Sequence, residues 1–594
     1  MHENNTAAMS KRKRNERTEA MHTFLQTMRQ LGISALLIML LSAAVWTPGQ
    51  CADSVPVEYA WQRSPELDFS WWITPQSPVL RAKPESLLSQ SADERLRAAQ
   101  ALVRLADQAA PTRDALLTAL MTRLEQGEPV PYVRAELVAA VCELDDGSQA
   151  ARLWKIVRDD AVSRPTFEQA CIDWRVPLLG DVWRSRLTTE SAHDGDLLRA
   201  LKGIGAVGTE LDIQALTDIV NDATRASALR LVAARAIGKL TNSDQVALAK
   251  QLRASSAEHA ELLAVLVIGE VATEPSKTFI IDVADHGSGL AQRHAYQWLC
   301  KHDAETALAR MTQFAQHTDS ELRRLSLNQA AGADSQDALT ILSAALSDPQ
   351  PALRNAAREF LVAQTTRSAD HLSSVKQMIT SHIAEEEWRS LQQCLRLVVD
   401  LRLTEHVPRM LELLEHQRPE VCITAAWALR HLGREETVLQ AMLEHVQGVT
   451  ERLDSPADDS APVEEFELRR VAHLMEGLGL RRYTPAAQTL MKYVPKRPEM
   501  GEITRMAGLW ACGKMWEGEE NADLVKQLCT CIADTQSLYP EPETVRFCAM
   551  LALGWLADPK TVDDIKAHGE AKPAAIGYAS EWALQRISNR SPIP

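Results

Sequence analysis

The densest set of groups that could bind a ligand is a basic stretch that begins at residue 469. Guanidinium groups bind carboxylates and phosphates through paired hydrogen bonds, and buried aromatic side chains commonly anchor protein partners. Because the stretch follows an acidic segment, one interpretation is internal charge pairing that fixes an acidic loop at 451–467, and another is that this loop is flexible. The third is a partner-docking patch, whose members would be Arg469, Arg470, Arg481, Arg482, Tyr483, Trp510 and Trp516.

The sequence contains none of the short motifs that mark common catalytic or phosphate-binding sites, such as HExxH, GxxxxGK(S/T), GxSxG or CxxCH. His286, His294 and His302 are spaced by eight residues, but lone histidines on helices usually face solvent or are hydrogen-bonded within the fold. The cysteines after Cys51 lie mostly in apolar runs, which favours small buried hydrophobes. We therefore expect no catalytic, metal-binding or cofactor-binding residue, no cofactor and no enzymatic activity.

Length and composition restrict the architecture that must position these residues. The chain has 594 residues, whereas a single core rarely extends past about 250–300 residues, so several domains or a repeat array are expected. Aromatic residues make up only 5% of a chain rich in Ala and Leu, which favours helices over sheets. The net charge of −15 argues against nucleic acid as a partner, because an acidic protein repels phosphate backbones.

An apolar pattern of helical period recurs along the chain. Its clearest copies are LRLVAARAIGKL from Leu229, LRNAAREFLVA from Leu353 and VRFCAMLALGWL from Val545. Neighbouring copies lie roughly 30–35 residues apart, a length that holds two helices and two short turns. Glycines such as Gly238 and Gly269 recur near the helix ends, where we expect tight packing against the adjacent repeat.

At these residues the chain resembles the HEAT-like repeat family, in particular the short bacterial type known from phycobilin lyase subunits. Asp348, Leu353, Arg354, Ala357 and Leu361 follow its core pattern of Asp, Leu-Arg, Ala and Leu. The resemblance implies an all-α fold, an α-solenoid in the form of a right-handed superhelix of about 14 helix pairs. It places the repeats at 85–450 and 468–594, on either side of the acidic loop.

The resemblance says little about activity. One HEAT-like enzyme type binds iron through His-Glu doublets, but the only such doublet here is His2-Glu3, near the start of the chain. Pigment or cofactor handling in the manner of a lyase stays an alternative that rests on fold analogy alone.

Residues 1–52 resemble a targeting segment. A basic stretch at 11–14 precedes an uncharged apolar run at 31–46, which is shorter than the roughly 20 residues that comfortably span a bilayer. This pattern predicts a cleaved signal peptide, with an uncleaved membrane anchor through 31–46 as the alternative. Either interpretation places the rest of the protein outside the cytoplasm, in the periplasm or secreted.

Residues 53–84 form a proline-rich and aromatic arm, in which five prolines exclude a regular helix. We expect it to lie extended over the first helix pair and to cover the outward apolar face of that pair. Alternatively, Trp71 and Trp72 would anchor a partner protein. The sequence as a whole predicts an extracytoplasmic scaffold that binds protein partners on the concave face lined by the second helix of each pair.

Overall fold

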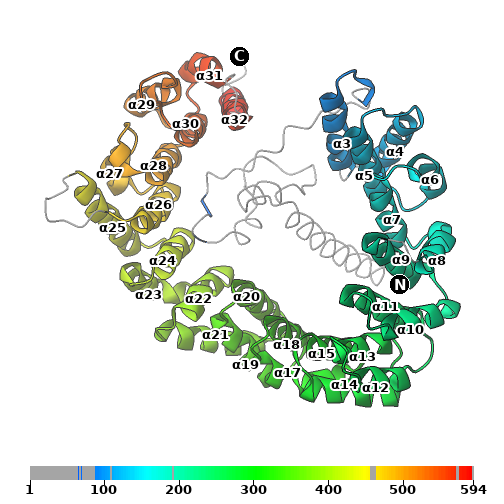
Figure 1. Cartoon of the computed structure of the whole chain (residues 1–594). Coiled ribbons are helices and arrows are strands. Elements are labelled where there is room, and N and C mark those ends of the chain that lie inside the picture. Colours follow the sequence, from blue (N-terminus) through cyan, green and yellow to red (C-terminus); the bar gives the residue numbers. More distant parts are fainter. Residues whose placement is uncertain are drawn as a thin grey trace, which may run out of the picture. The chain divides into compact units, whose positions relative to one another are not determined.

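The computed structural model describes residues 65, 68–69, 87–106, 110–189, 193–454, 463–569 and 574–590. These residues form helices and turns and no strand, and successive helices pack as antiparallel pairs (Figure 1). The predicted all-α solenoid is therefore confirmed. The chain divides into two compact units. We call residues 80–397 the N-terminal unit, and residues 1–79 with 398–594 the C-terminal unit.

The N-terminal unit is built from two rows of helices. Each helix contacts a helix of the other row, and consecutive helices of the row that begins with α3 also contact one another. One row comprises α3 (Ala92–Ala106), α5 (Pro131–Leu144), α7 (Arg164–Asp173), α9 (Asp194–Val207), α11 (Ser227–Leu240), α13 (Ala260–Ile268), α15 (Gly289–His302), α18 (Ser320–Gly332) and α20 (Pro351–Thr365). The other comprises α4 (Ala110–Glu125), α6 (Ala150–Val157), α8 (Gly180–Leu187), α10 (Ile213–Asn221), α12 (Val246–Arg253), α14 (Glu274–His286), α16 (Ala304–Ala309), α17 (Met311–Ala315), α19 (Gln336–Ala344) and α21 (Ala369–Ala384).

The C-terminal unit continues the same construction, and α22 (Trp388–Asp400) contains the boundary between the units. Its second-helix row comprises α24 (Pro419–Leu432), α26 (Glu465–Leu480), α28 (Glu502–Met515), α30 (Glu543–Leu556) and α32 (Ala574–Arg590). Consecutive members of this row pack directly against one another. The first helices of the pairs are α23 (Val407–Glu412), α25 (Glu436–Asp454), α27 (Ala487–Met491), α29 (Ala522–Ala533) and α31 (Val562–Gly569).

Helix α20 shows why this sequence forms such pairs. Pro351 occupies the first turn, where its fixed φ favours the helix and its missing N–H is not needed. Leu353, Ala357 and Leu361 then fall on one face and are all buried. That apolar stripe cannot be covered by a single helix, so the pair and its neighbours must stack to bury it.

An arginine–aspartate ladder joins successive repeats of the N-terminal unit. Arg323 of α18 donates two hydrogen bonds, of 2.7 and 2.9 Å, to the carboxylate of Asp348 in the turn before α20. Arg354 of α20 donates a 2.7 Å hydrogen bond to the carbonyl of Asp348. The repeat before is joined in the same way, because Arg293 donates to Asp319 at 2.6 Å. The Asp and Arg of the sequence pattern therefore fix the stacking of one helix pair on the next.

The predicted close packing at glycines holds between α11 and the end of α13. A Cβ atom on Gly238 would lie 2.3 Å from the carbonyl oxygen of Leu266 and 2.7 Å from the Cα of Gly269. Gly269 itself has a φ of +61°, which L-amino acids with side chains rarely adopt. The two glycines thus let neighbouring repeats approach at backbone distance.

The acidic segment differs from the predicted loop at 451–467. Helix α25 continues to Asp454 and α26 begins at Glu465, so both ends of the segment are helical. A capping box formed by Glu464 and Glu467 starts α26, since the glutamates satisfy backbone N–H groups of the first turn. Residues 455–462 lie outside the described residues.

Candidate partner-binding site

Three members of the predicted docking patch are buried. Arg470 is 6% exposed and donates a 2.6 Å hydrogen bond to the carbonyl of Leu414, in the turn of the preceding pair. The hydroxyl oxygen of Tyr483 lies 3.0 Å from Oε1 of Glu436 and 3.0 Å from Oε1 of Gln440, and its one proton can donate to either. Trp510 is 4% exposed, within α28. These side chains support the packing of the helices and do not form an exposed surface, which corrects their assignment to such a patch.

The remaining members of the patch are engaged within the fold to different degrees. Arg481 donates to the carbonyls of Gly433, Arg430 and His431, at 3.1 to 3.3 Å. Arg469 pairs with Glu465 at 2.6 Å, one turn away on α26. Arg482 is half exposed and pairs with Glu517 at 3.3 Å, and Trp516 is half buried at the end of α28.

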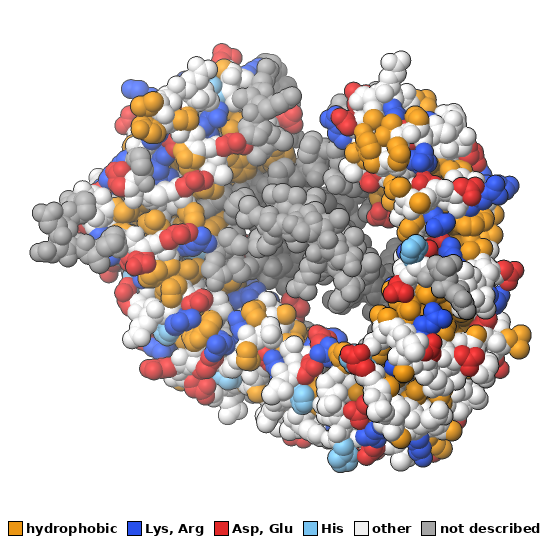
Figure 2. Space-filling model, viewed as in Figure 1, with side chains coloured by type: hydrophobic (Ala, Val, Ile, Leu, Met, Phe, Trp, Pro, Cys, Tyr) orange, Lys and Arg blue, Asp and Glu red, His pale blue; other side chains and the backbone are white. Residues whose placement is uncertain are grey.

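The acidic segment is also paired internally. Asp454 accepts hydrogen bonds from Lys492 at 2.8 Å and from Arg497 at 2.6 Å. Arg452 pairs with Glu467. These contacts correspond to the internal charge pairing that the sequence allowed. Acidic and basic side chains are interspersed over the visible face of the molecule in Figure 2.

The arm supplies a site that was not predicted. Its described residues Pro65, Asp68 and Phe69 contact α24 and α26, in the second-helix row of the C-terminal unit. For these three residues, the expectation that the arm covers the first helix pair was wrong. Trp71 and Trp72, also predicted as partner anchors, lie outside the described residues, as does the apolar run at 31–46. We call the contact of Asp68 and its neighbours with α24 and α26 the arm site.

The carboxylate of Asp68 is the centre of the arm site. Its Oδ2 atom accepts a 2.6 Å hydrogen bond from Nε1 of Trp427 and a 3.0 Å hydrogen bond from Nη2 of Arg430. Arg430 also donates to the backbone carbonyl of Asp68 at 2.6 Å and pairs with Glu476 of α26. All four residues are nearly inaccessible to solvent. The site therefore buries a carboxylate whose Oδ2 atom accepts two hydrogen bonds, one of them from a guanidinium group.

His473 of α26 recognises the other two arm residues. Its Nε2 atom lies 2.7 Å from the backbone carbonyl oxygen of Pro65, so Nε2–H is the donor. Its ring stacks on Phe69, with centroids 4.5 Å apart and planes inclined by 14°. The site thus contacts a side-chain carboxylate, a backbone carbonyl and an aromatic ring of one part of the arm.

The protonation states in the site follow from its burial and charges. Burial alone would raise the pKa of Asp68, but His431, Arg430 and Trp427 outweigh it and lower the pKa to about 2. Burial and the positive charge of Arg430 lower the pKa of His473 well below its usual value, so this imidazole is neutral. Nη2 of Arg430 lies 2.9 Å from Nε2 of His431, and burial together with the charge of Arg430 lowers the pKa of His431.

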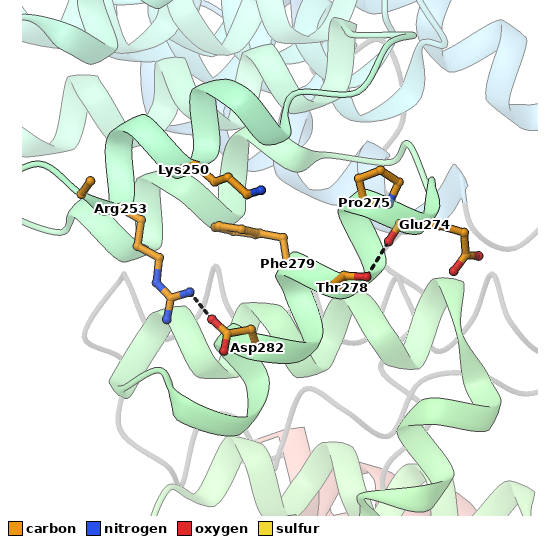
Figure 3. Close-up of a pocket in the computed structure, with 8 residues that line it drawn as sticks. Lys250, Arg253, Glu274, Pro275, Thr278, Phe279 and Asp282 are labelled. Carbon is orange, nitrogen blue, oxygen red and sulfur yellow. Dashed lines mark hydrogen bonds and ion pairs between the residues drawn. The ribbon is translucent and has the colours of Figure 1, made fainter.

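Two hollows elsewhere in the molecule have fewer converging polar groups than the arm site. A hollow of about 850 Å³ in the N-terminal unit lies between α12 and α14. Arg253 lines this hollow and pairs with Asp282, and its guanidinium carbon lies 5.7 Å from the ring centre of Phe279 (Figure 3). Thr278 donates a 2.9 Å hydrogen bond to the carbonyl of Glu274. A second hollow of about 1090 Å³ is lined mainly by the C-terminal ends of helices of the α3 row. Neither brings together the buried, convergent polar groups that the arm site does.

Several sequence expectations concern metal, redox or membrane chemistry. Among the described residues, no group of three or more His, Cys, Asp or Glu side chains could hold a metal ion. The nine cysteines from Cys142 to Cys548 are free, and most are buried. In the same part of the chain, no helix is both long and apolar enough to cross a bilayer.

The residues of the arm site could have been noticed in the sequence. The repeat helix at 421–433 places Trp427 and Arg430 in a mainly apolar run, and the helix at 471–480 places His473 and Glu476 in another. Large polar side chains in such a core need partners. The sequence gives no indication, however, that the partner is the arm, because Asp68 and Trp427 are 359 residues apart.

Comparisons with known proteins concern the fold alone. The chain matches no protein-family model and no curated protein. Importin beta, in a crystal structure from an ammonium sulfate condition, is similar with a TM-score of 0.46 and 10% identity, over 86% of this chain and 72% of that one. Kap121p is similar with a TM-score of 0.39 and 11% identity, over 96% of this chain and 57% of that one. At this level the likeness carries no argument about what the chain does.

Proposed function

We propose that this protein is a protein–protein interaction scaffold that works outside the cytoplasm. The observation that carries the proposal is the arm site, where α24 and α26 bind a distant segment of the chain through a hydrogen-bonded carboxylate and a stacked ring. A surface that binds such a segment from the same chain has the groups needed to bind one from another protein.

The architecture supports the same proposal. Stacked helix pairs provide long surfaces without an enclosed catalytic pocket, and solenoids commonly bind partners along such surfaces. We assign the partner to the second-helix row from α24 to α32, because this row contains the arm site. The sequence also led us to expect that the second helix of each pair lines the concave face. The proposed location outside the cytoplasm rests on the targeting pattern of residues 1–52, with 31–46 as the membrane tether if that segment is not cleaved.

Site-specific photo-crosslinking in cells would test the scaffold role. A crosslinking amino acid is placed in the full chain at Arg434, which is exposed just beyond α24, and in a matched variant at Glu519, which is exposed between α28 and α29. We expect a discrete protein adduct from position 434 that is absent from position 519. No adduct, or the same adducts from both positions, would contradict the scaffold role.

Two further measurements on the same strain test location and the alternative function. Fractionation with N-terminal sequencing should find the chain in envelope or secreted fractions. A cytoplasmic chain with an intact N-terminus would overturn the export part of the proposal. The purified full chain should carry neither a coloured cofactor nor stoichiometric metal. Finding either would favour a lyase-like accessory role over scaffolding.

A further inference from the structure

We propose that the arm site is a receptor for a chain segment in which Asp is followed by an aromatic residue, and that the arm is its internal ligand. A partner protein that carries such a segment binds by displacing Pro65, Asp68 and Phe69. This inference rests on the proposed function and specifies the partner chemistry of the same surface.

The first argument is the set of features that the site contacts. Trp427 and Arg430 hold the carboxylate of Asp68, and the ring of His473 stacks on Phe69. The other two contacts, from Arg430 to the carbonyl of Asp68 and from His473 to the carbonyl of Pro65, involve backbone atoms. Because backbone contacts are independent of sequence, the carboxylate and the ring define what a competing segment must supply.

The second argument is the set of donors that the arm leaves behind when it is absent. With the arm bound, the buried Nε1–H of Trp427 and Nη2 of Arg430 both donate to the carboxylate of Asp68. Without Asp68, both donors would lose this acceptor. A buried donor without an acceptor is costly, so the vacated site would favour an occupant that brings a carboxylate. An apolar or basic side chain at this position would not supply the acceptor.

The third argument is that the arm fits the site incompletely. Nε of Arg430 and Nδ1 of His473 are buried, and neither atom has a hydrogen-bond partner among the described residues. Unsatisfied buried donors and acceptors weaken a complex, typically by about 1–3 kcal/mol each. A partner segment that reaches either atom can therefore bind the site better than the arm does. The arm retains the advantage of being part of the same chain, which acts as an effective concentration.

Competition between the arm and a free peptide tests the inference on the full chain. The probe is a fluorescent peptide with the sequence of residues 61–73, compared with the same peptide carrying Asn in place of its Asp. We expect the full-length variant Asp68→Ala to bind the probe at least about tenfold more tightly than the wild type does, because its own arm competes less well. The Asn peptide should bind at least about tenfold more weakly than the probe.

Control variants keep the test decisive. Trp427→Phe keeps the ring but removes the N–H donor, and it should weaken probe binding in the Asp68→Ala background. Glu519→Gln, at an exposed position outside the site, should leave probe binding unchanged. If Asp68→Ala does not fold, Phe69→Ala replaces it as the variant with a weakened arm. Equal binding of the probe by the wild type and by both arm variants, or equal binding of the two peptides, would overturn the inference.

The outcomes separate this inference from the proposed function. Probe binding without any partner adduct at position 434 would leave the receptor intact and remove the scaffold role. An adduct that the probe does not displace would leave the scaffold and overturn the receptor. A dimer of the wild-type chain that the probe dissociates would show that the arm binds a second copy of this chain, which would also overturn the assignment to a different partner.

Discussion

Replacing Arg430 should uncouple the arm from α24 and α26. The side chain donates to the carbonyl and the carboxylate of Asp68 and pairs with Glu476, and it is 3% exposed. Arg430→Met would leave two buried carboxylates without their cation, and breaking a buried pair in this way costs about 3–5 kcal/mol. Asp68→Asn in the same background removes one of those carboxylates, so the double variant should be more stable than the sum of the single effects by about 2–3 kcal/mol.

Hydrogen exchange of the amides in α24 and α26, followed by mass spectrometry across a range of denaturant, reports the local opening free energy for this cycle. Local opening is the appropriate quantity because a chain of this size need not unfold in two states. Glu519→Gln is the matched control and should shift the opening free energy by less than about 0.5 kcal/mol. Additivity of the Arg430 and Asp68 effects to within about 0.5 kcal/mol would refute the assigned contact.

Three further predictions concern other features of the molecule. Probe binding by the Asp68→Ala chain should weaken by up to about 1.4 kcal/mol per pH unit as the pH falls below about 6.5. The reason is that His473 is neutral when a segment is bound, whereas an exposed imidazole gains a proton below this pH. A His473→Gln variant should show a flatter pH profile between 7.5 and 5.5. Gly238→Ala should lower the thermal midpoint and destabilise the N-terminal unit by about 1–3 kcal/mol, since its Cβ would meet a backbone carbonyl at 2.3 Å, whereas Gly448→Ala, with open space around it, should be neutral or stabilising. Asp348→Asn should destabilise the same unit by about 2 kcal/mol in urea unfolding, because it weakens the paired hydrogen bonds from Arg323; an unchanged midpoint would contradict the ladder.

The fold could be predicted because its determinants are local and repeated. The spacing of Leu353, Ala357 and Leu361 produces one apolar face per helix, and each such face must be buried by the next pair. The close approach at Gly238 was expected for the same reason, since it recurs at one position of the repeat. Such features need no knowledge of distant residues.

Part of the docking patch was assigned incorrectly, because Arg470 was taken for a surface residue on account of its charge. Arg470 is buried like Arg354, and each donates to a backbone carbonyl: Arg354 in the turn before its own helix, and Arg470 in the preceding helix pair. The arginine of the repeat pattern is thus structural, and its recurrence in the sequence was the available signal. The arm site could not be derived in this way, because it joins Asp68 to residues 359 and 362 positions later through a contact that no periodicity encodes.

The arm site also determines how tension would travel along the chain. Because Pro65, Asp68 and Phe69 bind α24 and α26, a pull applied between the two ends of the chain passes from the arm directly into the C-terminal unit. The polypeptide between Asp68 and Trp427 forms a side branch that bears no load while the contact lasts. If the N-terminal segment is held in a membrane, as proposed, the first bonds to be strained are those of Asp68 with Trp427 and Arg430. The helices of the N-terminal unit would bear force only after the arm is released, so this contact would protect them from unfolding under tension until it breaks.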